Sequence, residues 1–411
     1  MKRYRRTAAS QYLFVGLILA GVLAIAFLSA VALTRISFID QFAIPWAAGR
    51  AWLLEGTNPY DEAIINVAAE TLSDSQYIGV LPEQEALSIP ITSLVFYLPF
   101  SLMPFAISRA IWVTVLAICS GLIGFLSIKL AGWTLSNLEI SGIIFLLIGW
   151  VPGIFSILTG ELSPMIIFII LLGIYLLDKG QDTTAGFLLA LTFGAVPTTI
   201  FILTLLMVWS ISRRRWSIIV AYFSGVAFLL AVTLLMLPSW PLDLFRVNLA
   251  SYDNWNWIKT PLSRLAATLP GIANPFSIFL HGVFLIYFIY LVITTWAKTG
   301  RIFTWKIFVL LVVAVLLNIQ PSISHLYLIL PAVFLVFRVW SERWGRSGRI
   351  LSWILIFITA GSSWISFLPD IDFTQSPSMP FFIIGLPLLV LLGMIWIRWW
   401  ALKIRKLPFE A

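Results

Sequence analysis

Long apolar segments recur through this chain, and they constrain its fold more than any other feature. An α-helix needs about 20 consecutive apolar residues to cross the ~30 Å hydrocarbon layer of a bilayer, and several segments here reach that length. Charged residues make up 11% of the 411 residues, against about 25% in soluble globular proteins. The sequence therefore predicts an all-α polytopic membrane protein.

The apolar pattern predicts about twelve membrane helices in a single domain that covers residues 1–411. One segment, Thr184–Ile211, is ambiguous because Val196-Pro197 interrupts it and basic residues flank both of its ends. Proline breaks the hydrogen-bond ladder of a helix, so we expect two half-helices whose ends share one membrane face, with a single kinked span as the alternative. The other expected spans are Tyr12–Thr34, Ala106–Leu130, Glu139–Leu158, Pro164–Leu177, Ser217–Leu237, Phe276–Trp296, Ile307–Ile319, Leu326–Trp340, Ile350–Leu368 and Phe381–Trp400.

The distribution of basic residues predicts the orientation in the membrane. Twenty of the 26 Lys and Arg residues fall at the two termini and in the loops on that same side of the expected spans. Cytoplasmic loops carry such an excess, so both termini should be cytoplasmic and the protein should lie in the cytoplasmic membrane. The same pattern explains the net charge of +8, and we expect no nucleic-acid partner.

The stretch between the first two spans, about residues 35–105, is an extracytoplasmic loop too long to be a simple connector. It begins with an acid, Asp40, followed by the Trp- and Ala-containing segment Gln41–Glu55. We expect that segment to be an amphipathic helix on the membrane surface, with its tryptophans at interface depth. A second short helix is expected at Asp61–Leu72, and Ile89–Met103 should be interfacial or re-entrant.

Several stretches, taken in order, resemble glycosyltransferase family 87, a branch of the C-type (GT-C fold) superfamily typified by polyprenol-phosphate-mannose-dependent mannosyltransferases. They are Phe38-Ile39-Asp40 followed by AAGRAWLLEGTNPYD, then IPITSLVFYLPFSLMPFAISRAIW, then LTGELSPMIIFIILLGIYLLDKGQDTTAGFLLALTFGAVPTT, and finally QPSISHLYLILP. Two positions depart from the family pattern: its lysine before proline is Val196 here, and its glutamine after glycine is Glu161.

The resemblance implies an inverting glycosyltransferase that moves a hexose, such as mannose, from a polyprenyl-phosphate donor to a lipid-linked or other extracytoplasmic glycan acceptor. Asp40 is similar to the family's catalytic acid, and a carboxylate at the water–lipid boundary could serve as the general base for the incoming hydroxyl. The competing interpretation of Asp40 is an N-cap for the helix that follows, a position that Asp favours.

The departing phosphate needs positive charge or hydrogen-bond donors, and few outer residues can provide them. The candidate cations are Arg264, Lys259 and Arg109. Arginine suits phosphate because of its planar fork of donors, whereas the alternative for Lys259 and Arg109 is a side chain that snorkels to the interface. His325, expected to begin a helix at the outer surface, could donate to phosphate or sugar, and Glu161 could bind sugar hydroxyls or act as a second acid.

We expect no metal and no other cofactor. The chain has one cysteine and two histidines, too few for a thiolate or histidine metal centre. A lipid-monophosphate donor also lacks the pyrophosphate that commonly recruits a divalent ion. Asp370 and Asp372 are interpreted as a solvated loop, and His281, without polar neighbours along the chain, as a packing residue.

The main alternative function is a membrane transporter or lipid flippase without transferase chemistry. Ion-coupled carriers usually place ionisable residues at mid-membrane depth, and many are built from internal repeats. The expected spans show neither feature. A third option, a non-catalytic membrane scaffold, gives no reason for the acid-bearing first loop.

Overall fold

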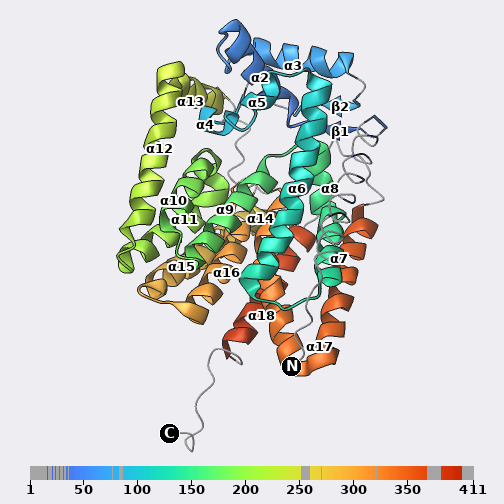
Figure 1. Ribbon diagram of the computed structural model, residues 1–411, viewed down its shortest axis with the longest axis vertical. Helices are drawn as coiled ribbons and strands as arrows, with labels where there is room; N and C mark the ends of the chain where they lie inside the picture. Colours follow the sequence, from blue (N-terminus) through green and yellow to red (C-terminus); the bar gives the residue numbers. More distant parts are fainter. Residues whose placement is uncertain are drawn as a thin grey trace, which may run out of the picture.

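The computed structural model describes residues 34–35, 37–75, 77–82, 87–250, 260–269, 271–319, 322–367 and 381–399, together with residues 16, 21, 24, 27 and 31. These residues form a bundle of helices, one end of which is covered by the elements of the first loop (Figure 1). At that end the strands β1 (Phe38–Ile39) and β2 (Gly79–Val80) pair in parallel. The expected class, an all-α polytopic membrane protein, is confirmed.

Six segments of the described chain are long and apolar enough to cross a membrane. They are α6 (Phe105–Ala131), Asp182–Ser212, α12 (Trp216–Met236), α15 (Ala273–Thr295), α16 (Gly300–Leu317) and Ile323–Ile365. A seventh exists if α7 (Asn137–Ile148) and α8 (Val151–Thr159) count as one bent span, and α9 (Ser163–Asp178) and α18 (Leu386–Ile397) are shorter apolar helices. The expected first span, Tyr12–Thr34, lies almost wholly outside the described residues. The count of twelve therefore stays a prediction.

The longest segment reverses direction partway along. Within α17 (Leu330–Phe367), Gly345 has a φ of 56° and a ψ of −123°, a conformation open to glycine but not to most residues. The arms before and after it lie together, so close that a Cβ on Gly348 would lie 2.1 Å from a carbonyl oxygen of the first arm. The two spans expected at Leu326–Trp340 and Ile350–Leu368 correspond to these two arms.

The segment Thr184–Ile211, for which the sequence left two interpretations open, folds as two half-helices. α10 (Asp182–Ala190) is followed by the 3₁₀ helix η2 (Leu191–Ala195) and by α11 (Val196–Ser212). Arg215, in the turn after α11, donates from Nε to Asp182 at the start of α10 at 2.8 Å, so both ends lie on one face. A straight helix of 31 residues would separate them by about 46 Å. The half-helix interpretation is confirmed.

Cysteine labelling provides a test of this hairpin. Cysteines placed at Lys179 and Arg213, in the turns before α10 and after α11, should react with a membrane-impermeant maleimide from the same side of the membrane. A cysteine at Asp61, an exposed first-loop position, is the control and should react only from the opposite side. The native Cys119 is buried and should not be labelled. Labelling of the two turn positions from opposite sides would contradict the hairpin.

The span expected at Glu139–Leu158 is not straight, because α7 and α8 are bent by 53° at the Gly149-Trp150 break. The bend brings backbones close together: a Cβ on Gly153 would lie 2.5 Å from the carbonyl oxygens of Leu147 and Ile148. Only glycine fits there. The break turns the end of α8 towards the elements of the first loop, which positions the candidate site described below.

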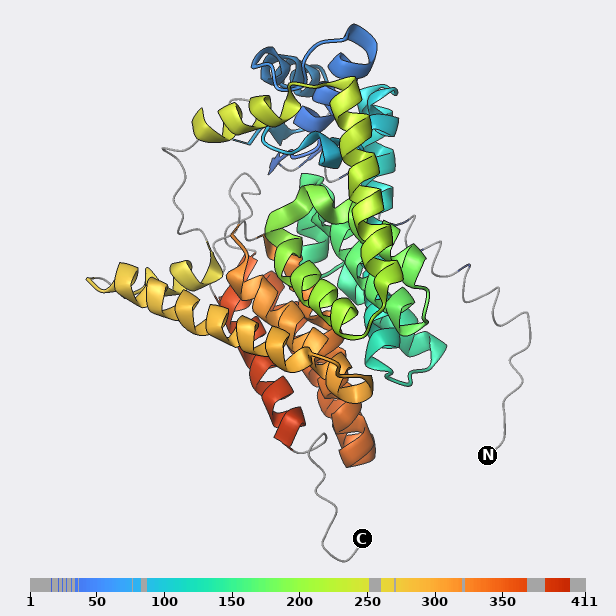
Figure 2. The same cartoon turned by 90° about the vertical axis from the view of Figure 1, so that its left-hand side faces the viewer.

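The first loop packs as a cap on one end of the bundle (Figures 1 and 2). Its elements are α2 (Ala43–Arg50), the π-helix η1 (Ala51–Glu55), α3 (Ala63–Asp74), and the one-turn helices α4 (Ile91–Leu94) and α5 (Leu98–Ser101). α13 (Trp240–Ala250) joins the cap from later in the chain, held by a 2.9 Å hydrogen bond from Asn58 Nδ2 to Asp243 Oδ2.

The helix expected on the membrane surface at Gln41–Glu55 has a different position in the structure. Every residue of Ala43–Gly49 is buried, so α2 lies inside the cap instead of on the membrane surface. Its small residues allow this, since a Cβ on Gly49 would lie 2.3 Å from the Ser101 hydroxyl of α5. The helix expected at Asp61–Leu72 is confirmed as α3. The segment Ile89–Met103, which was expected to be interfacial or re-entrant, forms α4 and α5.

Candidate functional site

The first-loop acid, Asp40, follows β1 and has 0% of its surface exposed. Its backbone N–H donates to the Val80 carbonyl of β2 at 2.8 Å. Its Oδ1 accepts the backbone N–H groups of Phe42 at 2.8 Å and Ala43 at 2.7 Å. The carboxylate therefore satisfies donors that a helix start leaves free, which is the capping role considered for this residue.

The other carboxylate oxygen pairs with an arginine from α6. Arg109 donates from Nε to Asp40 Oδ2 at 2.9 Å, and neither side chain has exposed surface. Its Nη2 donates to the Leu158 carbonyl of α8. Its Nη1 is buried without a hydrogen-bond partner among the described residues. The interpretation of Arg109 as a snorkelling side chain is wrong, because the side chain points into the protein and pairs with an acid.

Aromatic rings and a close backbone enclose this ion pair. The ring centroids of Phe38 and Phe42 each lie 5.6 Å from the Arg109 guanidinium carbon, within the range of cation–π attraction. Gly160 has a φ of +73°, and a Cβ there would lie 2.7 Å from Nη1 of Arg109. Trp112 donates from Nε1 to the Gly160 carbonyl at 2.9 Å. Glycine at position 160 thus leaves the space that the guanidinium occupies.

Glu161, the next residue, is the centre of a second polar cluster and is 7% exposed. Its Oε1 accepts the Ser163 hydroxyl at 2.5 Å, and its Oε2 accepts the hydroxyls of Ser322 and Ser324 at 2.7 Å each. Those two serines lie at the start of the 3₁₀ helix η4 (Ile323–Ile329). The carboxylate therefore connects the turn between α8 and α9 to a segment about 160 residues later in the chain.

His325 belongs to the same cluster and is 4% exposed, so its ring is buried within the protein at the start of η4. Its Nδ1 accepts the backbone N–H of Ser322 at 2.9 Å, and its Nε2 lies 3.0 Å from the hydroxyl of Thr198. Because Nδ1 accepts a hydrogen bond, the proton of the neutral ring is on Nε2, which donates to Thr198. Thr198 lies in the first turn of α11, beside the half-helix break.

Broken and irregular segments meet around these two clusters. The turn from Leu158 to Glu161 joins them, since Leu158 binds Arg109 and Glu161 binds the serines. The η2 break touches the first loop, where a Cβ on Gly194 would lie 2.1 Å from the Ser93 hydroxyl of α4. Non-helical backbone at membrane depth is tolerated where protein encloses it or where it lines a cavity. This convergence makes the two clusters the candidate functional site.

Of the remaining predicted site residues, the structure describes Arg264 but not Lys259. Arg264 is half-buried in α14 (Pro261–Ala266), at mid-height of the bundle and below the first-loop elements (Figure 1), and burial lowers its pKa. Lys259 lies outside the described residues, as do Asp370 and Asp372. His281 does have polar neighbours, contrary to expectation: its Nδ1 lies 2.7 Å from the Ser277 carbonyl, and its Nε2 lies 2.7 Å from the hydroxyl of Thr260, the N-cap of α14.

The site also contains residues that were not predicted from the sequence. Tyr97 of the first loop stacks on Trp112 with ring centroids 4.8 Å apart, and Thr198 contacts His325. The Ser-x-Ser-His pattern at 322–325 was visible in the sequence as a signal for the serines. No sequence signal connects Tyr97 or Thr198 to the acids, because these contacts depend on how the half-helices and the loop pack.

Within the described part of the chain, no group of three or more His, Cys, Asp or Glu side chains is placed to hold a metal ion. The site is instead a carboxylate–guanidinium pair beside a carboxylate–hydroxyl–imidazole cluster. Comparisons with protein-family models, with curated proteins and with solved structures found no match to this chain.

Proposed function

We propose that this protein is an inverting glycosyltransferase of the C-type superfamily, with a polyprenyl-phosphate hexose such as mannose as donor. It would act at the extracytoplasmic face of the cytoplasmic membrane on a lipid-linked or other glycan acceptor. The observation that most supports this is the buried Asp40–Arg109 pair, whose guanidinium retains one nitrogen, Nη1, without a partner in the described chain. The transfer needs a base and a phosphate-binding cation, and here these groups lie 2.9 Å apart.

Donor binding would free the base. In the structure both oxygens of Asp40 accept hydrogen bonds, from two backbone N–H groups and from Arg109. A donor phosphate can accept two parallel hydrogen bonds from a guanidinium and so competes with Asp40 for Arg109. As Arg109 turns towards the phosphate, Oδ2 of Asp40 loses its partner and becomes available. Arg109 would also take the place of the family lysine, which is Val196 in this chain.

The proposed reaction is a single displacement. Oδ2 of Asp40 takes the proton of the acceptor hydroxyl while the hydroxyl oxygen attacks the anomeric carbon. The bond from that carbon to the phosphate oxygen breaks, the phosphate keeps the electron pair, and Arg109 stabilises its added negative charge. The transition state is oxocarbenium-like, as in glycoside hydrolysis. Attack opposite to the leaving phosphate inverts the anomeric configuration.

The second cluster would bind the sugar. Glu161 and His325 are joined to the Asp40–Arg109 pair by the Leu158–Glu161 turn. Glu161 already accepts three hydroxyl groups from serines, and sugar hydroxyls can replace them with the same geometry. Arg264 and Lys259 are not included, since Arg264 lies in α14 below the first-loop elements and Lys259 lies outside the described residues.

A transfer assay tests this proposal. The purified protein in proteoliposomes should move radiolabel from polyprenyl-phosphate hexoses to a new product when a membrane extract supplies the acceptor. Transfer should persist in EDTA, since no metal is expected. Mannose and glucose donors are compared in parallel. Absence of product with every donor, together with absence of donor-dependent thermal stabilisation, would remove the proposal.

A transporter or flippase is the second candidate, and one observation favours it. The α7/α8 break and the α10/α11 half-helices lie next to buried ionisable groups, as the discontinuous helices of many carriers do. The same proteoliposomes separate the two functions. Movement of the unreacted lipid across the bilayer, without a new glycosidic bond, would favour the transporter.

A further inference from the structure

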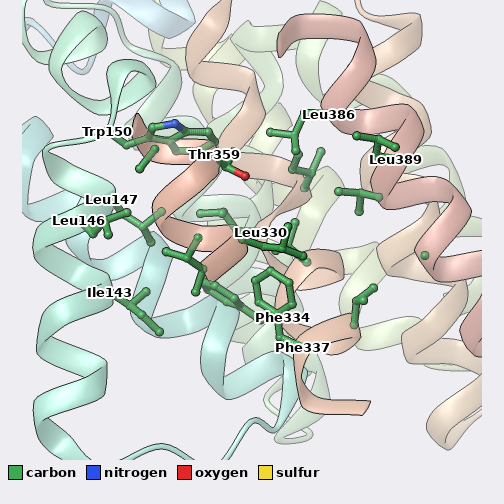
Figure 3. A pocket seen from close by; sticks show the side chains of 18 of the residues that line it. Ile143, Leu146, Leu147, Trp150, Leu330, Phe334, Phe337, Thr359, Leu386 and Leu389 are labelled. Atoms are coloured by element: carbon green, nitrogen blue, oxygen red, sulfur yellow. The ribbon is translucent and has the colours of Figure 1, made fainter. Parts of the chain in front are cut away.

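A second feature, separate from the candidate site, is an apolar cavity of about 350 Å³ between α7, the two arms of α17, and α18 (Figure 3). That volume lies within the ~300–1,000 Å³ of ligand pockets. Its walls are almost entirely hydrocarbon, and none of the described residues that line them is charged. The labelled side chains in Figure 3 are Ile143, Leu146, Leu147, Trp150, Leu330, Phe334, Phe337, Thr359, Leu386 and Leu389.

One polar group at this cavity has no partner. The indole Nε1–H of Trp150 is buried and makes no hydrogen bond within the described chain, and Trp150 is only 4% exposed. Figure 3 places it at the same end of the cavity as the Thr359 hydroxyl. A buried donor without an acceptor is unfavourable and rare. The indole therefore points to a ligand that supplies an oxygen atom at this end.

Water fits this position less well than an amphiphile. A buried water usually makes about three hydrogen bonds, and among the described side chains that line the cavity, only Trp150 and Thr359 offer polar groups at this end. A lipid hydroxyl needs fewer partners: it accepts from the indole N–H and donates to the Thr359 oxygen. The uncharged walls exclude a carboxylate or phosphate, since a charge buried without a partner is strongly disfavoured.

The opposite end of the cavity approaches the membrane boundary. Trp340 lines the cavity one helical turn after Phe337, which Figure 3 shows away from Trp150. Trp340 begins an aromatic row, with Trp344 at 5.8 Å from Trp340 and Trp396 at 6.0 Å from Trp344. Such rings mark the water–lipid interface, and the guanidinium carbon of Arg343 lies 5.8 Å from the ring centroid of Trp396. From Leu330 to Trp340 the first arm rises by about 15 Å. The cavity can therefore hold part of one hydrocarbon chain, with its hydroxyl at the deep end.

We propose that this cavity binds a neutral, single-chain lipid alcohol, with its hydroxyl between Trp150 and Thr359 and its hydrocarbon chain along α17 and α18. The site does not depend on the proposed transferase activity. It lies at the α7/α8 break, where Trp150 precedes α8, so a bound alcohol would stabilise the bend that positions the end of α8.

The test measures binding of hexadecanol to the delipidated full-length protein, by thermal shift and by photolabelling with a diazirine-bearing hexadecanol. Two control ligands have a chain of the same length. Palmitate carries a charged head group in place of the hydroxyl, and hexadecane has no head group. Hexadecanol should stabilise the protein saturably and more than either control ligand. Trp150→Phe and Thr359→Val should each weaken hexadecanol binding by about tenfold, the loss expected for one hydrogen bond.

The dependence on ligand distinguishes a binding role from a structural one. Without lipid, Trp150→Phe should lose only the packing of the larger ring, including its contact with Tyr327, because the N–H it removes has no partner; the additional stabilisation by hexadecanol should also shrink. Trp216→Phe, at an exposed indole on α12, is the control and should leave hexadecanol binding unchanged. Equal effects of hexadecanol and hexadecane, unchanged binding in both cavity variants, or displacement of hexadecanol by phospholipid would overturn the proposal.

Discussion

Replacing Asp40 with asparagine should lower the rate of sugar transfer by about 10²–10⁴-fold, the usual contribution of a positioned general base. The variant should also be less stable, because Arg109 loses its buried counter-ion at a cost of about 3–5 kcal/mol. Asparagine keeps the oxygen that accepts the N–H groups of Phe42 and Ala43, so α2 should remain capped. The transfer rate and the melting temperature in detergent measure the two effects separately.

A double variant separates catalysis from folding. Asp40→Asn combined with Arg109→Met removes both charges, so no buried charge is left unpaired. Its melting temperature should return towards that of the wild type, while transfer stays lost. Recovery of transfer together with stability would show that the pair only supports the fold. Arg109→Met alone should be unstable for the converse reason, since Asp40 would then be the unpaired charge.

A matched control comes from the same loop. Asp61 also accepts a backbone N–H at a helix start, that of Ala63 at 2.9 Å, but it is exposed. Asp61→Asn should keep transfer within about twofold of the wild type, since a capping substitution at an exposed position costs only ~1 kcal/mol of stability. A loss equal to that of Asp40→Asn would mean that first-loop capping, and not base catalysis, limits activity.

Glu161→Ala should cause the second large effect, a fall in the free energy of unfolding. Three hydroxyls, from Ser163, Ser322 and Ser324, would lose their acceptor. Each buried polar group left unsatisfied costs roughly 1–3 kcal/mol. The connection between η4 and the α8–α9 turn would loosen, and His325, one residue after Ser324, would lose its fixed position.

The measurement is a thermal melt in detergent, with limited proteolysis near residue 322 as a local readout. Glu161→Gln keeps one acceptor oxygen and should lose less stability than Glu161→Ala. Glu55→Ala, at an exposed position of η1, is the control and should melt like the wild type. If Glu161→Ala also melted like the wild type, the hydroxyl cluster would not be holding η4 in place.

The positions of most membrane helices could be read from the sequence because they depend on local composition. The ends of α6 and α12 agree with the expected spans to within one residue, since apolar length sets where a helix can enter and leave a bilayer. The division into two half-helices was also predictable, because proline and the flanking basic residues are local signals, although the break lies at η2, just before Val196-Pro197.

Other features were predicted wrongly because they depend on neighbours far along the chain. α2 has the composition of an interfacial helix, yet α3 and α5 cover it, so its burial was not a property of its own residues. Arg109 has the sequence context of a snorkelling residue, yet Asp40, 69 residues earlier, pairs with it. Sequence spacing carries no information about such a contact.

The sequence by itself determined the class of this protein, because the cost of placing polar backbone and charge in hydrocarbon leaves helices as the only structure for its long apolar segments. It also pointed to Asp40, Glu161 and His325 as chemically unusual residues for their positions. Only the tertiary structure decided which of them share a site. A buried charge is stable only when an opposite charge lies next to it in the folded protein, whatever their separation in sequence. The partner of Asp40 is therefore fixed by how α6, the first loop and the α8–α9 turn pack together.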